Sequence, residues 1–159
     1  MKALLYTFLL ALPLPSLAAD CEAVKANLAE GDLIFLEIDH MPFSQVAETT
    51  SSWTSHVGVV FQEKNQWVVY ESAIPRSRIT PLCDFVSHST HGRVAVTRSH
   101  EALSPEQVEK MRAKAKDMLG VLYHTGFDFD DWRQFCSKYA YLVYQAAGLE
   151  VGKLITFRD

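Results

Sequence analysis

The run RQFCSKYAYLVYQAAG at residues 133–148 constrains the fold most, because it predicts a helix with apolar side chains around most of its circumference. Two stripes repeat with the spacing of one broad helix face: Phe135, Tyr139, Leu142 and Ala146, and beside them Cys136, Ala140, Val143 and Ala147. We expect the helix to span about 134–147, with Gly148 ending it. Protein must surround such a helix on most sides, and its small alanines allow it to lie close to a sheet.

The other segments predict strands along the first half of the chain and a second long helix after them. We expect a short helix at 22–29, strands at 33–38, 56–62, 66–73 and 92–99, and a helix at 104–120. Ser104 and Gln107 form a capping-box pattern at the start of that helix. The polar segment 39–55 predicts a surface loop. This order of elements is typical of an α+β domain with a mainly antiparallel sheet.

The N-terminal segment 1–19 predicts a secretory signal peptide. Lys2 is followed by an apolar run that is too short to span a bilayer, and small residues then precede Asp20. Cleavage after Ala18 or Ala19 leaves a single domain, residues 20–159, of about 140 residues. We therefore expect an exported protein, periplasmic or secreted from a bacterium, with no stable membrane insertion after cleavage. Asp20 disfavours lipid attachment at Cys21, because lipoprotein processing requires a small residue directly before the cysteine.

Charge and cysteine content narrow the function further. A formal net charge of -4 argues against a nucleic-acid partner, because binding phosphates requires a basic face. Cysteines of exported proteins usually pair, and three cysteines leave at least one unpaired within the chain. If Cys21 pairs with Cys83, then Cys136 is the free thiol, but the sequence does not fix the pairing.

Cys136 stands in the first turn of the predicted final helix, where the unpaired N–H groups and the helix dipole favour thiolate over thiol. Arg133 and Lys138 add positive charge nearby. This pattern is typical of a nucleophile. A buried cysteine that serves only as a small apolar side chain is the alternative.

A cysteine nucleophile needs a base, and His56 is the best placed of the six histidines. His56 begins one predicted strand and Glu71 lies near the end of the next; an even-numbered hairpin loop puts both on one face, opposite or diagonal to each other. A carboxylate there would orient the imidazole, and Gly58 would leave space beside it. Alternatively, both are ordinary strand-end residues. The spacing of His88 and His91 could hold a metal only on a helix, which the polar run around them argues against, so we expect no metal or cofactor.

Five segments in this order resemble a known family: EGDLIF, SHVGVV, VYES, GVLY and FCSKYAY. They are similar to the circularly permuted branch of the NlpC-type papain-like cysteine hydrolases, most of all to YiiX/YebB-like proteins, with lecithin:retinol acyltransferases as more distant relatives. In this branch the histidine strand precedes the cysteine helix, as it does here. The resemblance implies a permuted papain-like fold, in which an antiparallel sheet packs against the helix that bears the cysteine.

The resemblance also implies roles for individual residues. Cys136 matches the nucleophile, His56 the base and Glu71 the third, orienting residue. Tyr123 matches a tyrosine near the active site, which could support an oxyanion, contact substrate or only pack. The implied mechanism is thiolate attack on a carbonyl carbon, a thioester acyl-enzyme, and hydrolysis, with the backbone N–H of Cys136 as an oxyanion donor.

Three functions remain open at this stage. The first is an amidase or peptidase acting on a small peptide, such as a cell-wall peptide, or on a related amide bond. The second is a lipid acyltransferase, thioesterase or lipid amidase on the same scaffold, since the aromatic residues Trp53, Phe127, Phe129 and Trp132 could line either kind of cleft. A binding module without catalysis is disfavoured, because all three catalytic residue types are present. The sequence does not predict the oligomeric state.

Overall fold

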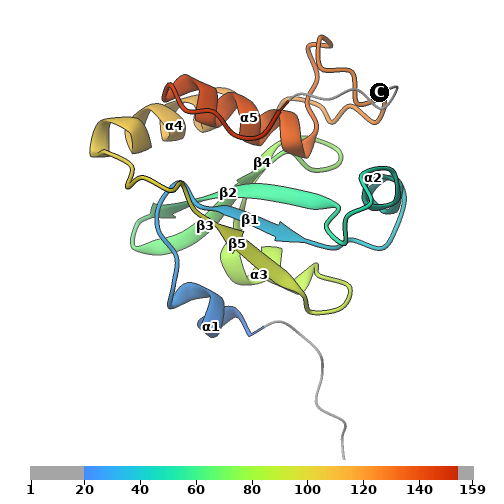
Figure 1. Cartoon of the computed structure of the whole chain (residues 1–159), viewed down its shortest axis with the longest axis horizontal. Coiled ribbons are helices and arrows are strands. Elements are labelled where there is room, and N and C mark those ends of the chain that lie inside the picture. The colour runs from blue at the N-terminus through green and yellow to red at the C-terminus, as the bar shows by residue number, and fades with distance from the viewer. Residues whose placement is uncertain (1–19, 154–159) are drawn as a thin grey trace, which may run out of the picture.

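The structure, a computed structural model, describes residues 20–153, so the predicted signal peptide lies outside the described residues. The strands of this part form one antiparallel sheet in the order β4-β3-β2-β1-β5, with helices on both faces (Figure 1). The elements are α1 (Cys21–Lys25), β1 (Leu33–Leu36), α2 (Phe43–Thr49), β2 (His56–Glu63), β3 (Gln66–Glu71), β4 (Arg78–Pro81), α3 (Leu82–Ser87), β5 (Val94–Thr97), α4 (Pro105–Asp117) and α5 (Cys136–Ala146). The predicted α+β class with an antiparallel sheet is confirmed. Within 20–153, every helix is too short or too polar to cross a membrane.

A tight hairpin joins β2 to β3 and fixes their register. Lys64 and Asn65 form its turn, with φ of 51° and 64°, the left-handed values that a two-residue type I′ turn requires. Val59 pairs with Tyr70 in the resulting ladder. This register places His56 and Glu71 on the same face of the sheet, diagonal to each other. The sequence allowed either this diagonal arrangement or a directly opposite one.

Each face of the sheet is covered by a different apolar cluster. On one face, β2 and β3 pack against α4 and α5 through side chains that include Val57, Val59, Phe61, Met111, Tyr139 and Val143. On the other face, a second cluster joins the sheet to α1 and α3 and includes Ile34, Leu36, Val60, Val69, Leu82 and Phe85. Figure 1 shows α4 and α5 on one side of the sheet and α1 and α3 on the other. The sheet is therefore the middle of three layers.

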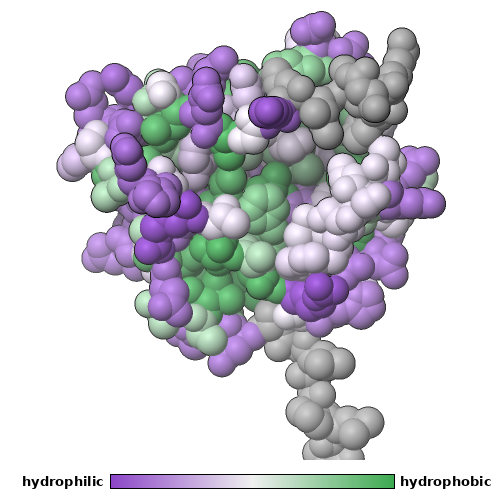
Figure 2. Space-filling model, in the orientation of Figure 1, coloured by the Kyte–Doolittle hydropathy of each residue, from purple (hydrophilic) through white to green (hydrophobic). Residues whose placement is uncertain are grey.

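The edge strand β5 leaves part of the apolar interior visible from outside. The Val96 residue of this strand is 38% exposed to solvent. Figure 2 shows apolar side chains across the middle of the face on which β5 and β1 lie in Figure 1, with hydrophilic side chains around them. The edge strand β5 therefore lies in an apolar patch that has a hydrophilic border (Figure 2).

The final helix begins at Cys136, slightly later than predicted. Phe135 is its N-cap residue, with an extended backbone, and Gly148 follows the helix with φ of 72°. The hydroxyl of Tyr139 donates to the Ala115 carbonyl at 2.7 Å and so links α5 to α4. Ala146 is exposed, so the buried face of α5 is narrower than the sequence predicted.

Three elements differ from the sequence-based expectation. Segment 39–55, predicted as a loop, contains α2, whose Phe43 is buried. The short elements β4 and α3 were not predicted, because four and six residues are too few to establish a periodicity. Cys21 and Cys83 form a disulfide between α1 and α3, and Cys136 is the free cysteine. This is the one pairing that was considered from the sequence, which did not fix it.

The close packing of β2 on β3 at Gly58 gives a stability prediction. A Cβ atom at this position would lie 2.2 Å from Cγ1 of Val69, whose side chain is fully buried. We expect Gly58→Ala to lower the free energy of unfolding by about 1–3 kcal/mol, as overpacked core positions do. Urea denaturation followed by circular dichroism measures the change.

Val69→Ala supplies the control, since it removes the atom that the new methyl group would meet. The double variant should lose less free energy of unfolding than the sum of the two single losses, because removing Cγ1 of Val69 makes room for the new methyl group. Strict additivity would contradict the proposed contact.

Candidate active site

His56 and Glu71 form a buried ion pair at one end of the sheet. Nε2 of His56 lies 2.5 Å from Oε2 of Glu71, and each side chain is 2% exposed. His56 is the first residue of β2 and Glu71 the last of β3, so the hairpin register alone brings them together. A buried carboxylate is stable only when it is paired and hydrogen-bonded, which makes this contact a strong constraint on both side chains.

The second oxygen of Glu71 is held by β4, which pairs with β3. Oε1 accepts a hydrogen bond from the Thr80 hydroxyl at 2.5 Å and one from Nε of Arg78 at 3.0 Å. Burial raises the pKa of Glu71, but the hydrogen bond and charge of His56, with Thr80 and Arg78, lower it overall to about 2. The carboxylate is therefore ionised and fixed in orientation. Arg78 and Thr80 were not predicted as site residues, because the four-residue segment RITP is too short for its alternation to predict a strand beside Glu71.

Cys136 meets His56 at the start of α5. Nε2 of His56 is taken by Glu71, and its other ring nitrogen, Nδ1, is buried without a fully formed hydrogen bond among residues 20–153. The thiol lies close enough for its interaction with the imidazole to change both pKa values. Resting active sites often hold such a contact in imperfect geometry, which tightens when substrate binds.

The two pKa values shift toward an ion pair. Burial lowers the pKa of His56, but its interactions with the Cys136 thiol and with the Glu71 carboxylate raise it overall to about 9. Burial raises the pKa of the Cys136 thiol, but His56, the backbone N–H of Val57 and the Tyr123 hydroxyl lower it overall. Near neutral pH the arrangement thus favours thiolate beside imidazolium, the reactive form of a cysteine nucleophile.

Tyr123 lies next to the thiol. Its hydroxyl is buried and interacts with both the thiol and the backbone N–H of Cys136, and burial and the nearby thiol raise its pKa. The Tyr123 N–H donates to the Pro75 carbonyl at 3.0 Å, and its strand segment forms a parallel bridge with Gln134. Two independent segments of chain therefore position this hydroxyl at the start of α5.

The aromatic rings of two further side chains enclose the imidazole. Phe43 of α2 lies edge-on to His56, with ring centroids 5.2 Å apart, and Phe85 of α3 lies 5.6 Å away. Phe43 also contacts Tyr123, at 5.8 Å. These rings keep water from the ion pair, which strengthens its electrostatic interactions.

Arg133 and Lys138 do not have the role that the sequence suggested. Arg133 pairs with Asp131 through two hydrogen bonds of 2.9 and 2.8 Å. The Lys138 ammonium donates to the carbonyls of Asp131 and Arg133. Both cations thus bind the segment that precedes Cys136, so they organise that segment while His56 carries the charge beside the thiol.

Two of the competing histidines have acidic partners of their own. Nδ1 of His91 lies 2.9 Å from Oε2 of Glu37, and Nε2 of His124 lies 3.7 Å from Oδ2 of Asp131. These pairs are separate from the Glu71 carboxylate. His56 is therefore the histidine that lies beside both a buried carboxylate, that of Glu71, and the Cys136 thiol.

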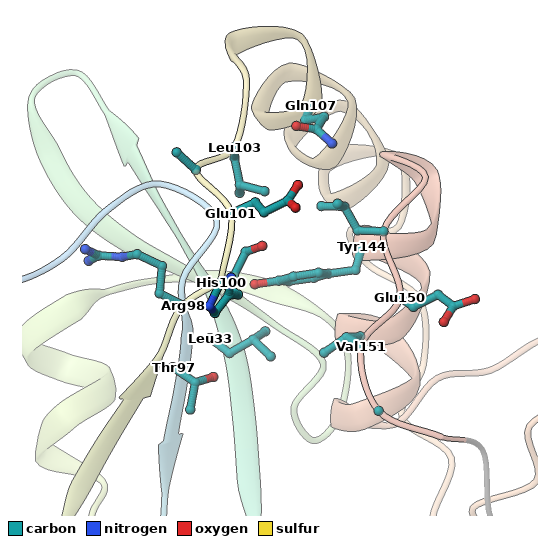
Figure 3. A pocket seen from close by; sticks show the side chains of 14 residues that line it. Leu33, Thr97, Arg98, His100, Glu101, Leu103, Gln107, Tyr144, Glu150 and Val151 are labelled. Carbon is teal, nitrogen blue, oxygen red and sulfur yellow. The ribbon is translucent and has the colours of Figure 1, made fainter.

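A cavity of about 470 Å³ lies at the other end of the sheet (Figure 3). Leu33 and Thr97 form part of its wall and pair with each other, whereas His56 pairs with Leu36 at the far end of β1. Tyr144, also in the wall, is eight residues beyond Cys136, about 12 Å along the helix. The hydroxyl of Tyr144 donates to the Gly31 carbonyl. This cavity is therefore separate from the cysteine site.

Residues 27–159 match a family described as permuted papain-like amidase enzymes of the YaeF/YiiX type, the C92 family. The chain belongs to this family. Its order of elements, with the histidine strand β2 before the cysteine helix α5, is the permuted order, so the papain-like fold predicted from the sequence is confirmed.

Two C92 relatives are from Escherichia coli. The uncharacterized protein YiiX of strain K12 is 33% identical over 124 residues, which cover 77% of this chain and 61% of the relative. The chain thus spans about three fifths of that protein. The crystal structure of YiiX from strain O157:H7, described as a metalloprotein, is similar with a TM-score of 0.73 and 34% identity, over 78% of this chain and 69% of that chain.

The hydroxyl of Thr80 gives a testable effect on the reactivity of Cys136. Thr80→Val removes a hydrogen bond that partly neutralises the Glu71 carboxylate, so the negative charge facing the imidazolium increases and stabilises it and, through it, the thiolate. The pKa of the thiol should then fall further, so the acid limb of its reactivity should move to lower pH by about 0.5–1 unit, equivalent to about 1 kcal/mol. The rate of Cys136 alkylation by iodoacetamide, measured from pH 4 to 9, reports this limb.

Thr80→Ser keeps the hydroxyl and is the matched control, so its profile should follow that of the unaltered protein. Identical profiles for the valine and serine variants would show that Thr80 only packs beside Glu71.

Proposed function

We propose that this C92 protein is a cysteine amidase in which Cys136 is the nucleophile, His56 the general acid and base, and Glu71 the residue that orients His56. The observation that carries the proposal is the buried His56–Glu71 pair beside the free thiol at the start of α5. Nucleophile, base and orienting group occur there in the order that cysteine hydrolysis requires. The family description as amidases supports the same chemistry.

In the first half of the proposed reaction, Sγ of Cys136 attacks the amide carbonyl carbon, and the carbonyl oxygen takes the negative charge. The Tyr123 hydroxyl contacts both the thiol and the backbone N–H of Cys136, so we assign this hydroxyl and this N–H as the oxyanion donors. The imidazolium of His56 then gives its proton to the amide nitrogen, the C–N bond breaks and the amine leaves. A thioester to Cys136 remains.

Water completes the cycle. Neutral His56 takes a proton from a water molecule as its oxygen attacks the thioester carbonyl, and Glu71 stabilises the imidazolium that forms. The C–S bond breaks, the carboxylic acid leaves and the thiolate–imidazolium pair is restored. The substrate that we propose is a small peptide or acyl amide, with cell-wall peptides as the first candidate if the protein is exported.

One relative is described as a metalloprotein, and a metal here would need a cluster of ligand side chains. Within residues 20–153, Cys21, Glu22 and Cys83 form the group whose ligand atoms lie close enough together to hold a metal ion. The two sulfurs of this cluster are joined in a disulfide and cannot bind a metal as thiolates. These residues do not fit a metal site, so the proposed mechanism uses protein groups alone.

Selective alkylation tests the proposed pair of Cys136 and His56. Iodoacetamide near pH 7 should label Cys136 rapidly, as located by peptide mass spectrometry, and His56→Ala should slow the labelling by at least tenfold because the thiolate loses its imidazolium. Hydrolysis of an acyl amide substrate should fall by about 10²–10⁴-fold in the same variant.

Exposed His88 is the matched control, since His88→Ala removes an imidazole far from the thiol in sequence and should leave the labelling rate unchanged. An inert Cys136, or equal rates in the unaltered protein and in His56→Ala, would refute the proposed roles.

We also propose that residues 1–19 direct export. The disulfide supports this proposal, because disulfides persist in oxidising compartments outside the cytoplasm. When the full chain is expressed in a bacterial host, the processed protein should be recovered from the periplasm or the medium. Mass spectrometry of the intact protein should show Ala19 or Asp20 as its first residue. A cytoplasmic protein that retains residues 1–19 would contradict export.

A further inference from the structure

A hollow of about 200 Å³ lies between α2 and the segment that leads to Cys136. Its lining comes from Gln45, Val46 and Thr49 on α2 and from Phe127 on the facing segment. Most of this lining is apolar, and it is open on one side. The hollow therefore suits an apolar group that enters from solvent.

The walls of the hollow are in contact with the residues that flank the thiol. Phe43, one helical turn before Val46, has its ring 5.2 Å from that of His56 and 5.8 Å from that of Tyr123. On the other wall, the Phe127 ring lies 5.5 Å from that of Phe135, the residue directly before Cys136. Two side chains, Phe127 and then Tyr123, would thus connect a group in the hollow with the thiol.

Phe127 is held in a conformation that its side chain disfavours. Its φ is 52°, in the left-handed region, which is unfavourable for a bulky aromatic residue. Its ring contacts Tyr123 as well as Phe135, with centroids 6.4 Å apart for Tyr123. Strained residues that the surroundings hold in place are concentrated at ligand-binding positions, and here the strain places an aromatic ring against the hollow.

The size of the hollow limits what it can bind. Pockets that enclose a whole small molecule measure about 300–1,000 Å³, whereas an apolar cavity of about 150 Å³ accommodates one benzene molecule. At about 200 Å³, the hollow has room for a single apolar group of four to seven carbons, by the same comparison. A long acyl chain would extend beyond it. The Thr49 hydroxyl already donates to the Gln45 carbonyl at 2.7 Å, so contacts to a ligand in the hollow would be mainly apolar.

We propose that this hollow is a specificity subsite for an apolar amino-acid side chain, of the size of leucine or phenylalanine, adjacent to the carbonyl that Cys136 attacks. This inference rests on the proposed function and defines its substrate class: peptides with a medium-sized apolar residue on the acyl side of the scissile bond. Filling such a pocket discriminates between side chains by about 10–200-fold.

Alkylating probes test the subsite without knowledge of the natural substrate. The probes are acetyl-glycyl, acetyl-leucyl and acetyl-phenylalanyl chloromethyl ketones, and 1-chloro-2-heptadecanone as a long-chain analogue. The thiolate of Cys136 forms an S–C bond, and the C–Cl bond breaks with loss of chloride. Second-order rate constants come from intact mass, each divided by the rate with iodoacetamide. We expect the leucyl or phenylalanyl probe to react at least tenfold faster than both the glycyl probe and the long-chain probe.

Two substitutions on α2 separate the subsite from general effects. Val46→Trp should fill the hollow and reduce the preference for the larger side chains to less than threefold. Glu48→Trp places the same ring on an exposed position of the same helix that does not line the hollow, and should keep the full preference. Thr49→Phe is a second filling variant at an exposed position, in case Val46→Trp lowers the folded fraction measured by circular dichroism.

The outcomes distinguish this proposal from the proposed function. If iodoacetamide labels Cys136 rapidly but the three peptide probes react equally, the subsite is refuted and the cysteine hydrolase stands. A faster reaction with the long-chain probe would also refute it, in favour of a lipid substrate. If iodoacetamide itself fails to label Cys136, the proposed function fails.

Discussion

The buried carboxylate of Glu71 is the constraint on which the site depends. A charge at this depth is stable only with a full set of partners, and three side chains from two strands provide them. His56 is one of these partners, so the imidazole is oriented by the same contacts that make the carboxylate tolerable in the core. The orientation of the base is thus a condition of folding, as well as a requirement of the chemistry that we propose.

The site forms where the two apolar layers of the domain meet. Phe85 of α3 packs against the ring of His56 on one side of the sheet, while Cys136 belongs to the cluster that α5 forms on the other. The start of β2 lies between them, and the backbone N–H of Val57 reaches the thiol. Helix, strand and both clusters must be in place before the thiol and imidazole meet.

Sequence reasoning recovered the elements that are long or strongly patterned. The periodicity of the final helix predicted the position of Cys136, and the parity of the β2–β3 hairpin predicted that His56 and Glu71 share a face. It did not find α2, β4 or α3. These segments are short, and contacts with distant parts of the chain stabilise them more than local preference does. Phe43, for example, packs against His56 and Tyr123, which lie far along the chain, and no local pattern reveals such contacts.

The position of the disulfide has a consequence for the chemical survival of the thiol. Cys21 and Cys83 join α1 to α3, and Cys21 packs in the cluster on the face of the sheet opposite to Cys136. A thiolate attacks a disulfide only by direct approach to one of its sulfurs. Because the sheet separates the two, the folded chain can keep a reactive sulfur and an oxidised pair in one small domain without exchange between them.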